Sequence, residues 1–246
     1  SRAAELAGDG ALVRAAANTR QRELDLMARS DLTLVVSAME QQLLRDLAPD
    51  VPVGLLSNLH EPVASPPSDA QRQDLVFVGG FRHPPNIDAV RWFIKDVFPL
   101  IRARIPDLRF HCIGSDPTRE ILACDGRDGV HIHGYVEDLD PYMDGGRVAV
   151  APLRFGAGVK GKINLSMAHG QPVVATSCAA EGMHLRNGHD VLVADDAAGF
   201  ANAVVRLYQD SALWQRLSTN GLENVRRHFS LDAARAGVRG IFRLRG

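Results

Sequence analysis

The sequence has few lysines, few cysteines and no long apolar run, and each shortage narrows what the chain can be. No apolar stretch approaches the ~18 residues of a membrane-spanning helix, so no transmembrane segment is expected. The three cysteines, Cys112, Cys124 and Cys178, have no CxxC spacing, which predicts free thiols in a reducing cytoplasm. The formal net charge of −1 supplies no long-range field for nucleic acid, so any anion site has to be local.

Positive charge comes almost entirely from arginine. Only Lys95, Lys160 and Lys162 among the 28 basic residues are lysines, and two of these three lie in the glycine-rich loop "GAGVKGK" at 156–162. A lysine ammonium is a compact point charge that suits a phosphate, and glycines expose backbone N–H groups. This loop is therefore a candidate anion site, and an exposed loop in which any cation would serve is the alternative.

Eight short apolar runs predict strands that are covered on both faces of a sheet. They span 32–37, 51–56, 75–80, 108–114, 130–136, 148–153, 172–177 and 190–195. Helical patterns lie between them at 86–105, 163–170, 197–209 and 211–227, with Asn86 and Asp116 as candidate N-caps and Gly170 as a helix end. Strands that alternate with helices predict an α/β fold with a Rossmann-like, doubly wound parallel sheet.

Composition divides the chain into four parts. Residues 60–73 are rich in proline and small polar residues and predict a linker. The segment 74–230 holds six of the strands and is expected to form the Rossmann-like domain. Residues 1–59 give only helix, strand, helix and strand, so they are expected to be the C-terminal part of an incomplete second α/β domain. Residues 231–246 are expected to form a C-terminal helix.

The loops that follow strands carry the candidate binding residues, because ligands of open α/β sheets bind beyond the carboxyl ends of the strands. Gly79 and Gly80 follow one strand, Tyr135 follows another, and the loop 154–162 lies between a third strand and a helix. Exposed N–H groups, a helix N-terminus and two lysines together suit a diphosphate. The Walker pattern GxxxxGK[ST] is absent, and without its hydroxyl and an acidic partner no metal site is expected.

Several segments together resemble one protein family. In order they are "LVFVGG…HPPNIDAVRWF", "VHIHGYVEDLDPYM", "VAVAPLRFGAGVKGKINLSMAHGQPVVATS" and "AAEGMHL". They resemble the donor-binding C-terminal half of the retaining, two-Rossmann-domain (GT-B type) glycosyltransferases of the glycosyl transferases group 1 family. Residues 1–50, with "DLTLVVSAMEQQLL", look like the end of that family's N-terminal acceptor domain.

The resemblance implies a nucleoside diphosphate sugar as donor substrate, no further cofactor and no metal. It implies transfer, with retained configuration, to an acceptor in polysaccharide or glycoconjugate assembly. By position it implies that Lys162 and Arg82 stabilise the leaving diphosphate in catalysis, with Lys160 close by. The other matching positions are expected to hold the phosphates, base and sugar: Gly79, Gly80, Gly134, Tyr135, Val136, Gly156, Ala157 and Gly158.

Two positions depart from the family pattern. Many members carry two glutamates eight residues apart where this chain has Ala157 and Leu165, and the second glutamate commonly contacts the ribose hydroxyls. Leucine cannot accept a hydrogen bond. Either Asn164 or Glu181 is expected to substitute for it, or the nucleotide is held differently.

Three functions stay open at this point. The first is a glycosyltransferase whose acceptor domain is incomplete, so that the 246-residue chain is expected to bind donor but not to transfer sugar alone. The second is a non-catalytic nucleotide-sugar-binding module, which Ala157 and Leu165 favour. The third is a nucleotide-sugar 2-epimerase, which needs ionisable side chains that the 156–162 loop hardly offers.

The expected partners are the nucleotide sugar and a sugar or lipid-linked acceptor, with no nucleic acid. The expected location is the cytoplasm, with association with the inner membrane through the N-terminal region as an alternative.

Overall fold

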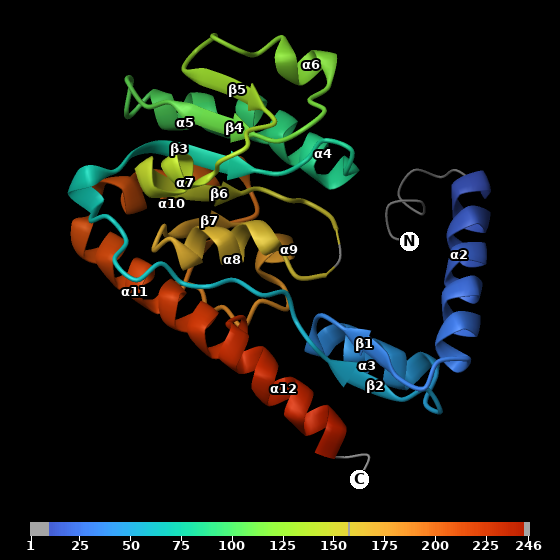
Figure 1. Ribbon diagram of the computed structural model, residues 1–246. Coiled ribbons are helices and arrows are strands. Elements are labelled where there is room, and N and C mark those ends of the chain that lie inside the picture. Colours follow the sequence, from blue (N-terminus) through green and yellow to red (C-terminus); the bar gives the residue numbers. More distant parts are fainter. Residues whose placement is uncertain (1–9, 157, 244–246) are drawn as a thin grey trace. The chain divides into compact units, whose positions relative to one another are not determined.

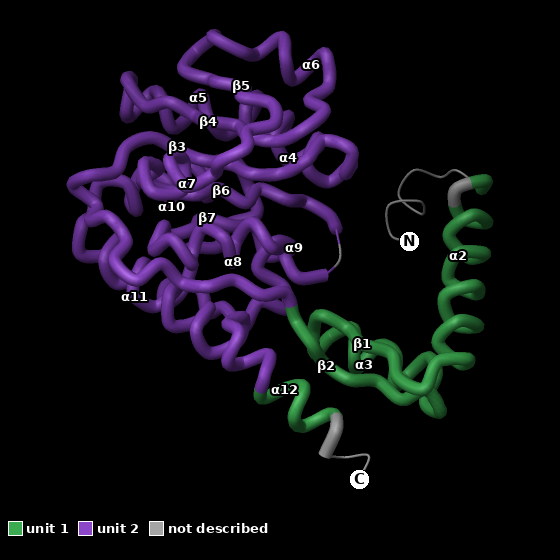
Figure 2. Tube along the Cα trace, in the orientation of Figure 1, with its two compact units in different colours: residues 1–57, 236–246 green, residues 58–235 purple. Residues whose placement is uncertain are grey.

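The computed structural model describes residues 10–156 and 158–243. The chain divides into two units (Figure 2): unit 1 comprises residues 1–57 and 236–246, and unit 2 comprises residues 58–235. Within the described residues, no helix combines the length and the apolar character needed to cross a bilayer.

Unit 1 contains the predicted order of helix, strand, helix and strand. These elements are α2 (Gly10–Ala28), β1 (Thr33–Val35), α3 (Ala38–Leu47) and β2 (Val53–Leu55). The two strands pair in parallel, and Ser37 and Glu40 cap α3 reciprocally through their side chains and backbone N–H groups. The second part of α12 (Leu231–Arg243) also belongs to this unit, where Gly237 lies close to the Leu55 carbonyl.

Unit 2 is built on a six-stranded sheet in the order β5-β4-β3-β6-β7-β8, and every pair of neighbours is parallel (Figure 1). The strands are β3 (Gln73–Val78), β4 (Phe110–Ile113), β5 (Val130–Gly134), β6 (Gly146–Ala151), β7 (Val173–Ala175) and β8 (Leu192–Val193). The Rossmann-like, doubly wound sheet predicted from the alternation of strands and helices is therefore confirmed. Strand order reverses between β3 and β6, which is where such sheets bind ligands.

Helices cover both faces of this sheet. The contacts group α5 with α10 on one face and α7 and α8 with α11 on the other (Figure 1). The bounds of these and the smaller helices are η1 (Asp69–Gln71), α4 (Pro84–Trp92), η2 (Phe93–Val97), α5 (Phe98–Arg102), α6 (Arg119–Leu122), α7 (Asp140–Gly145), α8 (Gly161–Ala168), α9 (Ser177–Ala180), α10 (Ala197–Gln209) and α11 (Ser211–His228). Gly170 has φ +64 just beyond α8, which confirms it as the residue that ends this helix.

Two helix starts differ from the prediction. The helix expected from 86 begins at Pro84 with His83 as N-cap, because two prolines at its start already have the helical φ, and it contains the π-helical turn η2. Asn86 is therefore not a cap but the third residue of α4. Asp116 is not a cap either: it has φ +57, and the Thr118 side chain caps α6 by accepting from Ile121 N–H.

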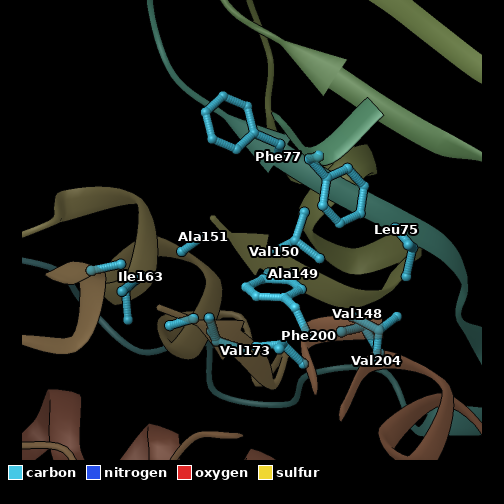
Figure 3. Close-up of a cluster of buried hydrophobic side chains, with 14 of the residues drawn as sticks. Leu75, Phe77, Val148, Ala149, Val150, Ala151, Ile163, Val173, Phe200 and Val204 are labelled. Carbon is cyan, nitrogen blue, oxygen red and sulfur yellow. The ribbon is translucent and has the colours of Figure 1, made fainter. Parts of the chain in front are cut away.

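The core of unit 2 lies between the sheet and these helices. Figure 3 shows Val148 of β6 beside Val204 of α10, and Phe77 of β3 together with Val150 in the same cluster. All four of these side chains are at most 2% exposed. Such packing fixes the position of the strands, and with it the position of the loops at their carboxyl ends.

Residues 60–73, expected as a linker, are bound to unit 2. His60 N–H donates to the Phe229 carbonyl and Val63 N–H to the Ala168 carbonyl, both at 2.8 Å. These bonds make the segment part of the Rossmann-like unit along its length.

The last part of this segment contributes a buried arginine, Arg72, which is 2% exposed. Its guanidinium donates to the carbonyls of Met143 (2.5 Å) and His169 (2.5 Å) and also to those of Pro67 and Gly146. Burial lowers the pKa of Arg72 to about 10, an effect that nearby Asp144 opposes, so the group remains charged at neutral pH. Arg72 thus ties the segment 67–72 to α7, β6 and the end of α8.

We predict that Arg72→Met lowers the free energy of unfolding by about 3 kcal/mol or more, because it leaves buried carbonyls without donors. Urea denaturation would measure the change. Arg227→Met is the matched control, since Arg227 is largely exposed and forms only an i,i+4 ion pair with Glu223, and it should change stability by less than about 0.5 kcal/mol. Equal effects of the two substitutions would contradict the role given to Arg72.

Candidate functional site

The loops after β3, β4 and β5 are joined at the carboxyl end of the sheet. Gly79 N–H donates to the Ile113 carbonyl and Gly114 N–H to the Gly134 carbonyl, both at 2.8 Å. A Cβ on Gly114 would lie 2.1 Å from the Gly79 oxygen, so only glycine allows this approach. The close contact brings the predicted phosphate residue Gly79 and the predicted base residue Gly134 to the same rim.

Lys162 reaches this rim from the first turn of α8. Its Nζ donates to Asn86 Oδ1 at 2.5 Å and lies 4.3 Å from the centroid of the Phe77 ring, a cation–π distance. A Cβ on Gly79 would lie 2.8 Å from both Lys162 Nζ and Asn86 Nδ2. Gly79 is therefore the residue that makes room for this ammonium, and two residues that the sequence analysis placed in one site are adjacent.

The surroundings of Lys162 disfavour its charge. Burial lowers the pKa of Lys162 to about 7, and the nearby Lys160 adds to this effect. Burial also raises the pKa of the Cys112 thiol, so this neighbour is neutral and does not balance the ammonium. An anion that reached Lys162 would favour the charged form and raise its pKa.

The ammonium of Lys160 lies against its own loop. Its Nζ donates to the carbonyls of Gly158 (2.7 Å) and Gly156 (3.4 Å), and its backbone N–H donates to Met183 Sδ at 3.1 Å. Lys160 therefore closes the glycine loop on itself at the start of α8. The loop residue Ala157 lies outside the described residues.

Arg82 and Gly80 follow Gly79 on the loop after β3. The Arg82 side chain is 86% exposed and pairs with Asp116 through Nε at 2.9 Å, so the structure does not join it to Lys162. The Gly80 carbonyl accepts a hydrogen bond from Asn86 Nδ2 at 2.7 Å. Of the two basic residues expected to act on the diphosphate, Lys162 contacts Asn86 and Phe77, and Arg82 pairs with Asp116 instead.

The predicted base segment is close to α8 through an apolar cluster. Val136 and Leu165 pack, together with Val78, against the buried side chains of Val76 and Ile113. Tyr135, next to Val136, is 77% exposed. Leu165 therefore contributes apolar surface at the place where many family members carry a carboxylate.

Neither expected substitute for that carboxylate is placed beside Leu165 on the surface. Asn164 is fully buried, and its amide has no hydrogen-bond partner among the described residues. Glu181 is exposed and follows the short helix α9. The inward direction of Asn164 follows from its place on α8, since consecutive helix residues point about 100° apart.

Asn86, Phe77 and Met183 are contact residues that the sequence analysis missed. Asn86 was assigned only as a helix cap, and Phe77 and Met183 were given no role. The position of Asn86, just after the glycine loop that follows β3, is the one local signal that could have identified it. Lys162 lies 76 residues further along the chain, so no local pattern links the two.

No three side chains of histidine, cysteine, aspartate or glutamate in the part of the chain that the structure describes are grouped so that they could hold a metal ion. His131 and His133 stack with His111 on β4 and β5, and His111 Nδ1 lies 2.9 Å from His133 Nε2. A hollow of about 710 Å³ lies between residues 184–190 and the end of α11. We assign the site to the rim because the glycines and the lysine meet there.

Known proteins share both sequence and fold with this chain. An uncharacterized 44.6 kDa protein in the cps region of Klebsiella pneumoniae is 22% identical over 169 residues, which are 65% of this chain and 44% of that protein. The sucrose-phosphate synthase of Thermosynechococcus elongatus superposes with a TM-score of 0.69 at 23% identity, over 90% of this chain and 60% of that one. The pneumococcal O-GlcNAc transferase GtfA, solved with UDP and GlcNAc, superposes with a TM-score of 0.72 at 12% identity, over 92% and 47%.

These structural likenesses show the fold, that of the two-Rossmann-domain (GT-B type) glycosyltransferases. The chain spans less than half of the length of the Klebsiella pneumoniae relative. Residues 72–210, more than half of the chain, match the family described as Glycosyl transferases group 1. The match covers β3 to α10 and includes Gly79, Asn86 and Lys162. The chain belongs to the glycosyl transferases group 1 family.

Proposed function

We propose that unit 2 binds a nucleoside diphosphate sugar and serves as the donor half of a glycosyltransferase that retains the configuration of the sugar. The diphosphate would lie at the ends of β3 and β6, between Gly79 and the start of α8. Family membership supports the class of reaction, and the GtfA structure contains UDP, which makes UDP a suitable first probe.

The observation that carries the proposal is the position of the Lys162 ammonium. It is partly buried, next to a glycine whose missing side chain leaves space, and at the N-terminal turn of α8. The first N–H groups of a helix have no partner inside the helix, and the helix dipole adds positive potential there. A diphosphate at this place would be stabilised by the Lys162 ammonium and by the N-terminus of α8. Such stabilisation of negative charge is what the leaving group of a glycosyl transfer requires.

The base and the sugar would lie on either side of the diphosphate. Gly134, Tyr135 and Val136 offer the exposed backbone and the aromatic surface for a base, and Leu165 adds an apolar contact beside Val136. Gly156 and Gly158 would lie against the sugar. The acceptor we propose is a sugar or lipid-linked saccharide in polysaccharide assembly, which agrees with a relative from a cps region.

A second candidate function is nucleotide-sugar binding without transfer. Leu165 favours it, because an apolar residue that packs against the buried cluster of Val76, Ile113 and Met143 cannot replace a carboxylate that contacts ribose. Release of nucleotide and formation of glycosylated product, measured with UDP-sugars and saccharide acceptors, separate the two. Binding with no product from any length of the protein that includes a complete acceptor domain would favour the second candidate.

We predict that Lys162→Met weakens binding of UDP by about 10- to 100-fold, because a hydrogen bond to a charged group contributes roughly 1.5–3 kcal/mol. Isothermal titration calorimetry near pH 6.5, where Lys162 is mostly charged, measures the change. A thermal-shift screen with UDP, GDP, ADP and inorganic pyrophosphate comes first, since a ligand that binds only the folded state stabilises it.

Lys95→Met is the matched control for that experiment. Lys95 is an exposed lysine of η2, outside the rim, and its loss should leave UDP affinity unchanged. Wild-type affinity in the Lys162→Met protein would refute the proposed site.

The same lysine should reduce stability in a pH-dependent way. The folded-state pKa of Lys162, about 7, lies below the unfolded value of 10.5, so the unfolded chain binds more protons between these two pH values. Wild-type stability therefore rises with pH across this window, and the contribution of the buried charge is most unfavourable below pH 7.

We predict that the stability of Lys162→Met relative to wild type is higher at pH 6 than at pH 9, by on the order of 1–3 kcal/mol. Urea denaturation at the two pH values measures the difference. For Lys95→Met, the difference in unfolding free energy from wild type should be the same at pH 6 and pH 9. A pH-independent offset for Lys162→Met would mean that the amine is as well solvated in the folded protein as in the unfolded one.

A further inference from the structure

We propose that Asn86 is the positioning residue of this site, which holds the Lys162 ammonium and the Gly79–Gly80 loop in one arrangement before a diphosphate binds. This inference rests on the proposed function. It assigns a role to a residue of α4 that neither the family pattern nor the strand-end loops identified.

The Asn86 amide has both of its polar atoms bonded across three elements. It is 7% exposed, its Oδ1 accepts from Lys162 Nζ of α8, and its Nδ2 donates to the Gly80 carbonyl after β3. The reverse orientation of the amide would place its N–H groups against an ammonium and its oxygen against a carbonyl. The two bonds together therefore fix the orientation.

A fixed acceptor matters because a lysine side chain is long and has many rotamers. Ordering such a chain costs up to about 2 kcal/mol of conformational entropy, and a ligand that found it already ordered would not bear that cost. The Lys162–Asn86 contact joins α8 to α4, and the bond from Asn86 to the Gly80 carbonyl adds the loop that follows β3.

The neutrality of this acceptor is equally important. A carboxylate at position 86 would hold the ammonium too, but it would cancel the charge that a diphosphate needs. The amide leaves the net positive charge in place, and an ammonium has three donors, of which Asn86 takes one. The ionisable neighbours that act on Lys162 are Lys160 and Cys112, and neither supplies a negative charge at neutral pH.

The test uses two substitutions, Asn86→Ala and Asn86→Asp, and a readout that does not need a ligand. The chain has three lysines, so the Nζ and Cε signals of Lys162 in an NMR pH titration can be assigned by comparison with the Lys162→Met and Lys95→Met proteins. Asn86→Ala removes the acceptor and should lower the pKa of Lys162. Asn86→Asp adds an opposite charge and should raise it by about one unit or more.

Asn86→Asp keeps the size of asparagine and an acceptor for Lys162, and it removes the donor to the Gly80 carbonyl. Urea denaturation of both Asn86 variants shows whether they fold before their titrations are compared. Asn202 of α10 provides the matched control. Its exposed side chain accepts a hydrogen bond from Arg104 Nη1 at 2.7 Å rather than from Lys162. Neither Asn202→Ala nor Asn202→Asp should change the Lys162 titration.

The second readout is the binding of inorganic pyrophosphate, which tests the proposed phosphate site without the nucleoside. At pH 6.5 we expect Asn86→Ala to weaken pyrophosphate affinity about tenfold. Asn86→Asp should weaken this affinity at least as much, although Lys162 is more fully charged in that variant. A merely structural role would not produce opposite pKa changes together with losses of affinity in both variants.

Three results would count against the proposal. An unchanged Lys162 titration in both Asn86 variants would overturn it whatever the binding data show. Wild-type pyrophosphate affinity in Asn86→Ala would overturn it while leaving the proposed function intact. If the wild-type protein bound neither pyrophosphate nor UDP, the proposed function would be overturned and this inference with it.

Discussion

A lysine ammonium enclosed at the carboxyl end of a parallel sheet is the constraint on which the rest of the site depends. Burial disfavours the charge of Lys162, and the fold keeps it there with one neutral acceptor and one aromatic face, Asn86 and Phe77. Residue 79 has to be glycine, because a Cβ at this position would lie 2.8 Å from Lys162 Nζ. Groups that are unfavourable for stability concentrate at functional sites, and this is such a group.

Two cations of unit 2, Arg72 and Lys162, show how the same physics serves different purposes. Arg72 directs its fork at four backbone carbonyls, so its hydrogen-bonding capacity is used within the fold. Among the described residues, Lys162 Nζ donates a hydrogen bond to Asn86 Oδ1 and lies over the Phe77 ring, so its donors are not all used within the fold. Arginine thus supports the side of the sheet where the segment 67–72 and α7 meet, and lysine is placed at the strand ends.

Leu165 shows how a family member can keep the phosphate region and change its surroundings. The residues of the proposed diphosphate site are glycines and a lysine, whereas Leu165 is apolar and, like Val78 and Val136, packs against the buried cluster of Val76, Ile113 and Met143. Asn164 points inward and cannot compensate. The selectivity for the nucleoside would then depend on shape and backbone contacts around Gly134 to Val136, and the phosphates would contribute the larger share of the affinity.

The sequence by itself determined the eight strands, the helices between them and the Gly170 helix end, because periodicity and glycine act locally, and it placed Gly79 and Lys162 in one predicted site. It misplaced the helix starts at Asn86 and Asp116, where prolines and a threonine decided the cap. Only the tertiary structure showed that Lys160 turns back on its loop, that Arg82 pairs with Asp116, and that Asn86 holds Lys162. Those contacts depend on strand order and register, which bring together residues far apart in the chain and which no local pattern specifies.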